Sequence, residues 1–319
     1  MPSLSRLAIL DDYQGVALSM GPWDRLPKSL SIEVFRDTLK DREALVQRLA
    51  PFDAILGMRE RTPFPAALIE RLPNLKLLIT TGERNRGFDV AAAKARGITV
   101  SGTPGAGAPT VDITWALILN LLRNVPAEME SLRAGRWQTT VGTSAGGLTL
   151  GVVGLGKLGT RVAAVGKALG MKVIAWSQNL TPEKAEAAGV AYATKEELFA
   201  RADVVTLHVI LSDRSRGLVG AADLARMKPG AIIVNTSRAP LIDQAALIAA
   251  LNERRIRAGL DVFDDEPLPP DAPILACPNT MLTPHLGYVS SQAYAAYFEG
   301  AVAAIEGYMA GKPVMELPA

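Results

Sequence analysis

The stretch LTLGVVGLGKLG, residues 148–159, decides the fold class of this 319-residue chain. Its first half is almost wholly apolar, as in a buried strand of a parallel sheet, and the residues after it continue with helical spacing. Gly154, Gly156 and Gly159 therefore stand in the turn between a strand and a helix. There the first glycine makes a tight turn, the second admits a pyrophosphate, and the third lets the helix pack closely. The stretch predicts a dinucleotide-binding loop, with a plain strand-to-helix turn as the alternative.

Short runs rich in Val, Ile and Leu alternate with longer Ala-rich segments through the second half of the chain. This alternation is typical of parallel strands whose sheet carries helices on both faces. With the strand that opens the glycine loop, six strands are expected, which suits a Rossmann-type doubly wound α/β domain. The expected strands are 148–153, 172–176, 204–209, 231–236, 258–262 and 281–283.

The first hundred residues show the same alternation on a smaller scale and predict a flavodoxin-like α/β domain with a parallel sheet. Its expected strands are 7–11, 32–35, 54–58, 75–80 and 98–101.

Two apolar helices are expected to link these halves. One covers 109–123 and begins beside the Gly/Pro-rich loop 102–108, and the other covers 290–309 and is expected to return to the first half. The predicted organisation is a dinucleotide-binding domain at 103–287 and a discontinuous substrate domain at 1–102 and 288–319.

The composition indicates a folded protein with a small-molecule partner. Hydrophobic residues make up 49% of the chain and charged residues 21%, which is ample for packed cores. The net charge of +2 is spread without a basic run, so no nucleic-acid surface is expected. Cys277 is the single cysteine, which excludes an intramolecular disulfide and a multi-cysteine zinc site. Without a signal-peptide pattern or a membrane-spanning apolar window, a cytoplasmic protein is expected, and no metal is expected.

The end of the second Rossmann strand bears on the choice of dinucleotide. NAD sites usually place Asp or Glu about 20 residues after the glycine loop, where the carboxylate binds the ribose 2′-hydroxyl. Residues 174–179 read IAWSQN and contain no carboxylate. They would not repel a 2′-phosphate, but they also lack an Arg or Lys to attract one. The expected cofactor is NAD(P)(H), with the balance toward NADP(H).

Three polar stretches follow expected strands, at the edge where ligands bind in open α/β sheets. They are NTSRA at 235–239, GLDVFDDEP at 259–267 and TPHLG at 283–287. A guanidinium, a carboxylate and an imidazole could thus converge. From the residues alone, His285 could equally be a packed ring, Arg238 a surface ion-pair residue and Glu266 a solvated loop carboxylate.

In order and spacing these stretches, with the glycine loop, 207–212, 216–220 and 227–230, resemble the D-isomer-specific 2-hydroxyacid dehydrogenases. This is the family of glyoxylate, hydroxypyruvate and phosphoglycerate-type enzymes. The resemblance implies hydride transfer between nicotinamide and a 2-oxo or D-2-hydroxy acid, in a cleft between two lobes. It also implies three catalytic residues: His285 as general acid and base, Glu266 orienting its ring, and Arg238 binding the substrate carboxylate and carbonyl.

The resemblance further implies a set of cofactor-binding residues around the carboxyl edge of the sheet. They are Gly154, Leu155, Gly156, Lys157, Leu158, Gly159, Ser177, Gln178, Val209, Ile210, Thr236, Ser237, Asp261 and Gly287. His208 matches a strand histidine of the family and is interpreted as structural.

The substrate loop departs from the family pattern. Relatives usually have two spaced glycines and an aspartate, whereas residues 80–89 read TTGERNRGFD, with Arg84 and Arg86 at two of those positions. Amides around Gly82 and Glu83 are expected to hold a substrate carboxylate. With Arg59, also expected at the substrate, the arginines suggest a second acidic group or a longer chain than glyoxylate. The alternative is surface arginines paired with nearby glutamates.

The resemblance also implies a homodimer, with RAGRW at 133–137 as part of the dimer arm. Two other functions remain open. A formate dehydrogenase-like enzyme shares the architecture but typically has Gln beside the histidine, and Glu266 argues against it. A cofactor-sensing binding protein of the same fold is the alternative outside catalysis.

Overall fold

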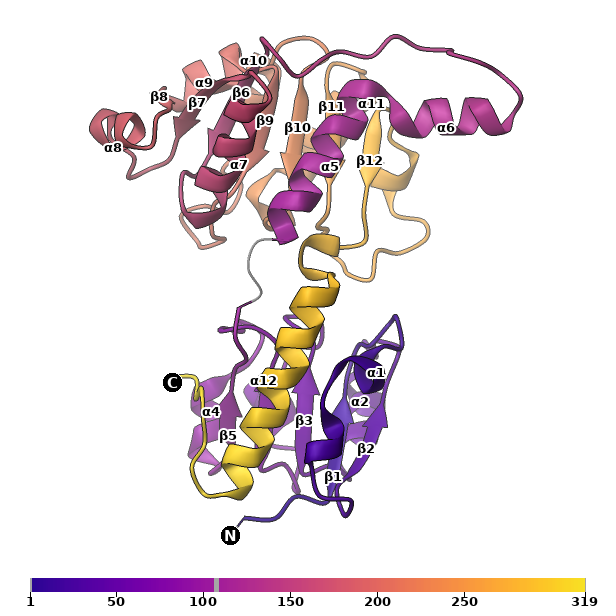
Figure 1. Ribbon diagram of the computed structural model, residues 1–319, viewed down its shortest axis with the longest axis vertical. Coiled ribbons are helices and arrows are strands. Elements are labelled where there is room, and N and C mark those ends of the chain that lie inside the picture. The colour runs from indigo at the N-terminus through magenta and orange to yellow at the C-terminus, as the bar shows by residue number, and fades with distance from the viewer. Residues whose placement is uncertain (1, 106–108, 319) are drawn as a thin grey trace. The chain divides into compact units, whose positions relative to one another are not determined.

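The computed structural model describes residues 2–105 and 109–318, so residues 106–108 of the expected connector loop lie outside the described residues. The chain divides into two compact units, shown in Figure 1. Unit 1 comprises residues 1–107 and 289–319, and unit 2 comprises residues 108–288. In the described residues, no helix has the length and apolar character needed to cross a bilayer.

Unit 1 is built on a five-stranded sheet in the order β2-β1-β3-β4-β5, and every neighbouring pair is parallel. This is the flavodoxin-like order that the sequence predicted. The strands are β1 (Arg6–Ile9), β2 (Ser31–Val34), β3 (Ala54–Gly57), β4 (Leu77–Thr80) and β5 (Thr99–Ser101).

Helices cover both faces of the unit 1 sheet, as expected for an all-parallel sheet. The long helix α12 begins after Ser290, whose hydroxyl accepts from the Ala293 amide, and packs against α1 and β4. The other face carries a core that includes Leu49, Phe52 and Phe64, each at most 2% exposed. The helices are α1 (Ala17–Met20), η1 (Trp23–Arg25), α2 (Arg42–Leu49), α3 (Ala66–Ile69), α4 (Val90–Ala95) and α12 (Ser291–Met309).

Unit 2 contains a seven-stranded parallel sheet in the order β12-β11-β10-β9-β6-β7-β8. The chain winds in both directions from β6, so the strand order reverses between β6 and β9, the place where doubly wound sheets bind ligands. The strands are β6 (Thr149–Val153), β7 (Lys172–Trp176), β8 (Ala191–Tyr192), β9 (Val204–Leu207), β10 (Ile232–Asn235), β11 (Arg257–Leu260) and β12 (Thr280–Leu282).

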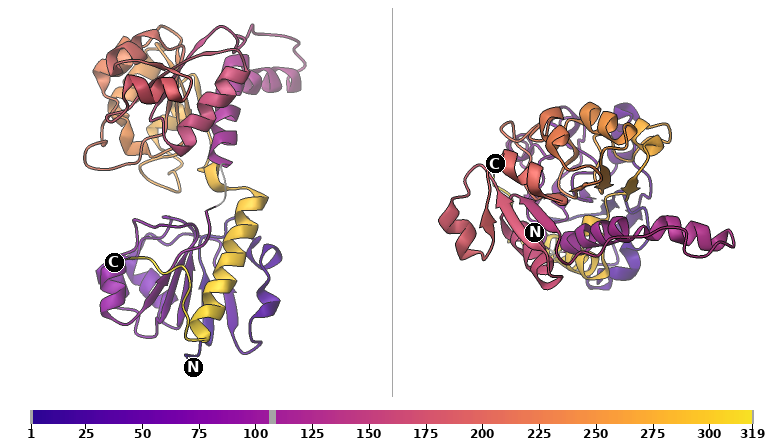
Figure 2. Two further views of the ribbon diagram at one scale, coloured as in Figure 1. Left: turned by 60° about the vertical axis from the view of Figure 1, so that its left-hand side comes forward. Right: turned by 90° about the horizontal axis from the view of Figure 1, so that it is seen from above.

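The two faces of the unit 2 sheet bury separate cores. One core lies under α5 and α7 and includes Trp115 and Val162, and the other lies under α9 to α11 and includes Phe199. Helix α6 extends from the end of α5 beyond the sheet of its own unit (Figure 2). The helices are α5 (Pro109–Arg123), α6 (Val125–Arg133), α7 (Lys157–Ala168), α8 (Pro182–Ala187), α9 (Lys195–Arg201), α10 (Ala221–Arg226), α11 (Gln244–Asn252), η2 (Ala239–Leu241), η3 (Pro273–Ala276) and η4 (Leu286–Tyr288).

The expectation of six strands in this sheet was wrong by one. The additional strand, β8, pairs with β7 over Ala191 and Tyr192, and both residues are exposed. A strand of two residues is too short to show the periodicity by which strands are recognised in a sequence. Several other strands end earlier than expected: β9 stops at Leu207 and β11 at Leu260. The residues after these ends leave the ladder and form the loops of the candidate site.

Candidate active site

The imidazole of His285 and the carboxylate of Glu266 are hydrogen-bonded, with 2.6 Å between Nδ1 and Oε2. The two residues follow β12 and β11, which pair in parallel, so their loops leave the same edge of the sheet. The other carboxylate oxygen, Oε1, accepts from the Phe263 amide at 2.8 Å. Each side chain is 19% exposed, so the pair is partly shielded from water. A carboxylate held in this way fixes the orientation of the ring.

Asp261 fixes the turn that carries His285. Its carboxylate accepts from the Thr283 hydroxyl at 2.6 Å and from the amides of Leu286 and Gly287, both at 2.7 Å. The turn needs this support because His285 has a φ of 53°, in the left-handed region that a non-glycine residue rarely adopts. Burial raises the pKa of Asp261, and the donated hydrogen bonds oppose the rise. Because Asp261 is 0% exposed, it acts here through the turn, and its cofactor contact stays a prediction.

Tyr288 packs on the catalytic candidate from one side. Its ring meets the His285 ring edge-on, with 5.5 Å between the centroids and 69° between the planes. Tyr288 is 8% exposed, and both rings belong to unit 2. Sequence reasoning missed this residue, because nothing in a lone tyrosine three positions after a histidine distinguishes a ring contact from core packing.

Arg238 follows β10, the next strand along the sheet from β11. The Asn235 amide donates to the Arg238 carbonyl at 2.9 Å, and the Asn235 side-chain oxygen accepts from the Ser237 amide at 3.0 Å. The Ser237 hydroxyl donates to the Leu207 carbonyl at 2.7 Å, which ties this turn to β9. The three catalytic candidates therefore follow three neighbouring strands, each on a loop held by hydrogen bonds that are at least partly buried.

The glycine loop has the geometry that a pyrophosphate site requires. Gly154 has a φ of 97°, and its amide donates to the Trp176 carbonyl at 2.8 Å. A Cβ on Gly159 would lie 2.0 Å from the Gly154 carbonyl oxygen, so the helix packs there only through glycine. A Cβ on Gly156 would meet nothing within 4 Å, which leaves open space at the start of α7. These residues fit a dinucleotide phosphate beside the backbone and the helix N-terminus.

The other predicted cofactor residues divide into two groups. Lys157 is exposed, and Leu155 and Leu158 are partly exposed, in the loop and the first turn of α7. Val209 packs against the loop, and Ile210 is 73% exposed. Thr236 is turned differently: its hydroxyl lies 2.9 Å from the Thr114 hydroxyl of α5 in a buried pair.

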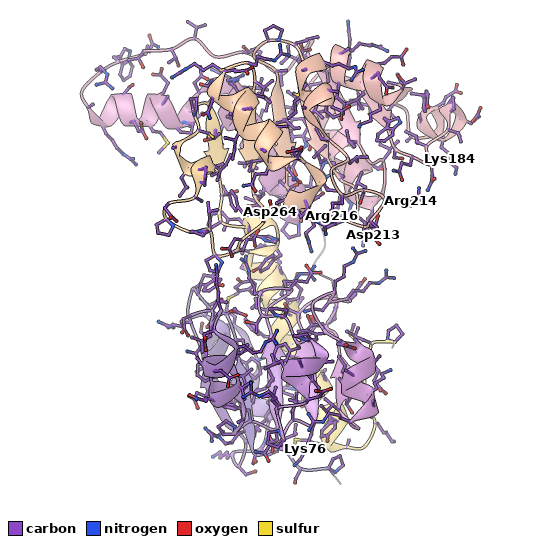
Figure 3. The ribbon with its side chains drawn as sticks, turned by 180° about the vertical axis from the view of Figure 1, so that it is seen from behind. Lys76, Lys184, Asp213, Arg214, Arg216 and Asp264 are labelled. Atoms are coloured by element: carbon purple, nitrogen blue, oxygen red, sulfur yellow. The ribbon has the colours of Figure 1, made fainter. Side chains whose placement is uncertain are left out.

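Ser177 and Gln178 follow β7, and sequence reasoning missed the partner of Gln178. Arg214, from the turn after β9, donates to the Gln178 side-chain oxygen at 2.6 Å. Figure 3 shows Arg214 and Arg216 at the same end of unit 2 as Asp264. A cation 36 positions away in sequence thus stands beside the acid-free end of β7.

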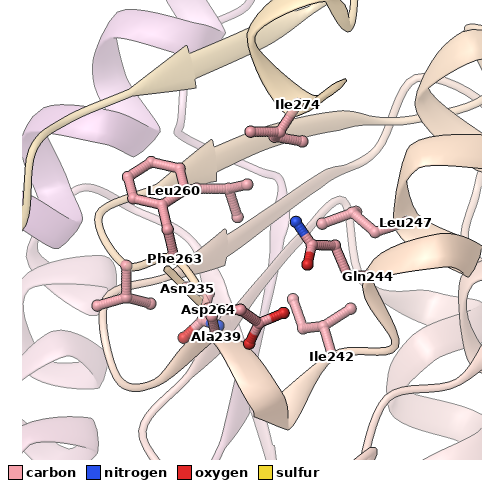
Figure 4. Close-up of a pocket in the computed structure, with 10 residues that line it drawn as sticks. Asn235, Ala239, Ile242, Gln244, Leu247, Leu260, Phe263, Asp264 and Ile274 are labelled. Carbon is pink, nitrogen blue, oxygen red and sulfur yellow. The ribbon is translucent and has the colours of Figure 1, made fainter. Parts of the chain in front are cut away.

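A small cavity lies behind the loops that carry Arg238 and Glu266 (Figure 4). It has a volume of about 20 Å³, the room of one water molecule, so it cannot hold a substrate. Its walls support the two loops from behind and are mostly apolar. They include Asn235, Ile242, Leu247, Leu260, Phe263 and Asp264.

In unit 1, Arg59 lies directly over Gly82. A Cβ on Gly82 would stand 1.8 Å from the Arg59 Nη1 atom, and that guanidinium donates to the Thr81 carbonyl at 3.2 Å. The Gly82 amide donates to the Thr103 hydroxyl at 2.7 Å. The Gly82 amide is thus hydrogen-bonded within the chain, and its role toward a substrate carboxylate stays a prediction. Arg59 instead brings a charged donor to the same place.

Asn85 organises the substrate loop and was also missed from the sequence. Its amide nitrogen donates to the Arg59 carbonyl at 2.5 Å and to the Thr80 hydroxyl at 2.8 Å, and its oxygen accepts from the Gly87 amide at 2.8 Å. Asn85 is 7% exposed, whereas Glu83 and Arg84 beside it are exposed. A buried side-chain amide therefore joins the backbone after β3 to the end of β4.

Arg59 and Arg84 have no carboxylate partner among the described residues. Across residues 2–105 and 109–318 neither forms an ion pair, so their pairing with Glu83, one form of the alternative in which surface arginines pair with nearby glutamates, is not observed. Burial raises the pKa of Tyr297 on α12, and the Arg59 guanidinium opposes that rise. The positive charge of Arg59 thus lies near the buried phenol of Tyr297.

His208 directly follows β9 and carries a neutral ring. Its Nε2 lies 3.0 Å from the Thr206 hydroxyl, and burial lowers its pKa to about 4. Its Nδ1 is buried and has no hydrogen-bond partner within the described part of the chain. These contacts give it no charged form near neutral pH.

Comparisons with known proteins agree with this geometry. Residues 115–287 match the family model for the NAD binding domain of D-isomer specific 2-hydroxyacid dehydrogenases. The chain is 33% identical to glyoxylate reductase of Korarchaeum cryptofilum over 277 residues, which cover 84% of this chain and 83% of that protein. A crystal structure of phosphoglycerate oxidoreductase from Vibrio cholerae shares 38% identity with a TM-score of 0.92, covering 97% of this chain and all of that one.

Longer relatives match as well. The chain is 39% identical to D-3-phosphoglycerate dehydrogenase of Methanocaldococcus jannaschii over 257 residues, or 79% of this chain. The match covers 49% of that protein, so the chain spans about half the length of the phosphoglycerate dehydrogenases it matches.

Proposed function

Because the chain belongs to the D-isomer-specific 2-hydroxyacid dehydrogenase family, we propose that it interconverts a D-2-hydroxy acid and its 2-oxo acid as a NAD(P)-dependent oxidoreductase. The observation that carries this proposal is the hydrogen bond of 2.6 Å between His285 Nδ1 and Glu266 Oε2. When bound, the nicotinamide supplies or accepts the hydride. The chain's own residues then have to bind the acid and move one proton.

His285 is the proton donor in the reductive direction. Since Glu266 holds Nδ1, Nε2 is the nitrogen left to give a proton to the carbonyl oxygen as negative charge develops there. In the oxidative direction the same nitrogen accepts the hydroxyl proton. The Asp261 hydrogen bonds keep the ring in place, because they hold the strained turn on which it stands.

Arg238 binds the substrate carboxylate and polarises the carbonyl. A guanidinium offers paired N–H donors that match a carboxylate, and its charge stabilises the developing oxyanion. Its turn is held by Asn235 and Ser237, so the backbone that carries it is fixed before substrate arrives.

The glycine loop would hold the dinucleotide phosphates, with Gly156 leaving space for them. The end of β7 carries Ser177 and Gln178 rather than a carboxylate, which favours NADP(H) because no negative charge opposes a 2′-phosphate.

The substrate carries a second acidic group or a chain longer than that of glyoxylate. Arg59 and Arg84 support this, because two guanidinium groups without ion pairs in the described residues stand near the end of β4. Arg59 is also anchored by the Asn85 side chain, so its position does not depend on a bound ligand.

A screen of 2-oxo acids with NADH and NADPH tests both the reaction and the substrate. Glyoxylate, hydroxypyruvate and a dicarboxylic 2-oxo acid are compared for the wild type, Arg84→Ala and the control Lys94→Ala, which removes an exposed cation on α4. Turnover of the dicarboxylic acid should fall most in Arg84→Ala. Equal losses for all three acids would remove the second-acid proposal, and no turnover of any 2-oxo acid would remove the dehydrogenase.

The chain acts as a homodimer that uses α6 and the segment after it. Met129 and Leu132 on α6 are 47% and 58% exposed, and Trp137 and Val141 beyond it are 76% and 96% exposed. A contiguous stretch with this many exposed apolar side chains is typical of a surface that another protein covers.

A further inference from the structure

Arg214 and Gln178 form a reciprocal pair across the carboxyl edge of unit 2. The guanidinium donates to the Gln178 side-chain oxygen at 2.6 Å, and the Gln178 amide donates to the Arg214 carbonyl at 3.3 Å. Gln178 lies on the loop after β7, and Arg214 on the turn after β9. Strand β6 lies between those two strands, so the pair spans the end of β6, where the glycine loop begins.

The glycine loop is in contact with both of these strand ends. The Gly154 amide donates to the Trp176 carbonyl at 2.8 Å, and a Cβ on Gly154 would stand 2.7 Å from the His208 carbonyl oxygen. The Gln178–Arg214 pair therefore lies at the same edge as the loop that fits the dinucleotide phosphates. In such folds the end of the second Rossmann strand receives the ribose of the adenosine half.

The turn that presents Arg214 is fixed from below. Ser215 is 3% exposed, and its hydroxyl donates to the Ile210 carbonyl at 2.8 Å while it accepts from the Ser212 amide at 2.8 Å. The Arg214 side chain itself is exposed (Figure 3). A buried serine thus holds the turn, so that the guanidinium is directed by the backbone as well as by Gln178.

The positive charge of Arg214 has no carboxylate partner in the structure as described. Other cations of unit 2 do: Lys195 pairs with Asp223 at 2.8 Å, and Lys228 with Asp203 at 2.7 Å. Gln178 orients the guanidinium through a neutral oxygen and leaves its charge available. A glutamate at that position would neutralise it.

We propose that Arg214 selects NADP over NAD by binding the 2′-phosphate, with Gln178 as the neutral residue that orients it. This assignment rests on the proposed dinucleotide function. It supplies a cation for the 2′-phosphate from the turn after β9, since the loop after β7 contains no Arg or Lys. Guanidinium groups bind phosphate through paired, charge-assisted hydrogen bonds, which a ribose hydroxyl cannot match in strength.

Binding of two nucleotide fragments tests the assignment without turnover. The probes are 2′,5′-ADP, which carries the 2′-phosphate, and 5′-ADP, which does not, and dissociation constants are measured by calorimetry. In Arg214→Ala, 2′,5′-ADP should bind about tenfold to a hundredfold more weakly, the range expected for one hydrogen bond to a charged group, while 5′-ADP binding stays within twofold. Arg216→Ala removes a cation from the same turn and serves as the matched control.

Gln178→Glu provides a second variant with almost no change of shape. It should weaken 2′,5′-ADP as Arg214→Ala does, because the new carboxylate pairs with Arg214 and repels the phosphate, and it should not weaken 5′-ADP, because a carboxylate at this strand end can accept from the ribose 2′-hydroxyl. The ratio of kcat/KM for NADPH to that for NADH should fall in parallel.

The outcomes distinguish failure of the role given to Arg214 from failure of the dinucleotide-binding function. Equal weakening of both probes in Arg214→Ala would show contact with the adenosine body and overturn the assignment, as would an unchanged 2′,5′-ADP affinity. If the wild type binds neither probe, the dinucleotide function itself fails. If it binds 5′-ADP alone, the function stands and the role of Arg214 falls.

Discussion

Replacing Glu266 by glutamine removes one charge and one acceptor while keeping the size of the side chain. In the structure, the two carboxylate oxygens serve two different donors: Oε1 accepts from the Phe263 amide at 2.8 Å and Oε2 pairs with His285 Nδ1 at 2.6 Å. A glutamine has one oxygen, so one of the two N–H groups must face an NH₂ group. The substitution therefore either frees the loop or turns the imidazole.

The size of the effect follows from the lost interaction. A hydrogen bond to a charged group contributes about 1.5–3 kcal/mol, and each 1.4 kcal/mol corresponds to about tenfold in rate or affinity. In the oxidative direction the bond strengthens toward the transition state, because the ring becomes charged as it accepts the hydroxyl proton. In Glu266→Gln, kcat/KM for the 2-hydroxy acid should fall roughly tenfold to a hundredfold.

The assay follows the absorbance of the reduced nicotinamide during turnover, and cofactor affinity is measured separately by fluorescence. Cofactor binding should stay within twofold, because Glu266 acts through His285. Asp265→Asn removes the neighbouring charge and is the matched control. Turnover of Glu266→Gln within twofold of the wild type, or an equal loss in Asp265→Asn, would refute the role given to Glu266.

Three further perturbations have defined outcomes. Gly159→Ala places a Cβ 2.0 Å from the Gly154 carbonyl oxygen and should lower the free energy of unfolding, measured in urea, by about 1–3 kcal/mol. In Gly156→Ala the new Cβ meets nothing within 4 Å, so this variant should weaken only cofactor binding. Equal stability of the two variants would contradict this. The pKa of His208 is about 4 in the folded chain against 6.5 for a free side chain, so below pH 6.5 the unfolded state binds the proton first and stability falls, by at most about 3 kcal/mol near pH 4. The free energy of unfolding of His208→Gln, measured by urea titration at about pH 6.5 and about pH 4, should fall less between these pH values than that of the wild type. An identical fall would exclude His208 as its cause. Leu132→Glu, at a site 58% exposed, should convert a dimer into a monomer in light scattering without loss of stability, and an unchanged mass would exclude α6 as the interface.

The sequence predicts those parts of the fold that depend on local composition. Parallel strands buried on both faces appear as apolar runs, and the expected α/β class with its flavodoxin-like and Rossmann-type sheets is confirmed. The two-residue strand β8 is exposed and too short to show the pattern of a buried strand, so it was not found in this way. Strand ends were also placed too late, because β11 ends at Leu260 although the apolar pattern continues to Val262.

In the candidate site, too, the sequence predicted the residues that belong to motifs and missed the pairs that only the fold brings together. Motif order pointed to Glu266 and His285, and the structure brings them into contact although 19 positions separate them. The pairs that pattern reading missed depend on which residues the folded chain places together. Arg214 and Gln178 are 36 positions apart and Asn85 and Arg59 are 26 apart, and neither pair has a spacing that a motif could encode.

Asn85 has a consequence for how this loop can change during evolution or engineering. Its side chain donates to the Arg59 carbonyl and the Thr80 hydroxyl, so one buried amide fixes the backbone after β3 to the end of β4. Restoring glycine at Arg84 alone would leave Arg59 anchored over Gly82 and would not rebuild the relatives' loop. Rebuilding the relatives' loop therefore requires linked substitutions at positions 59, 84 and 85, and no single one of them would be enough.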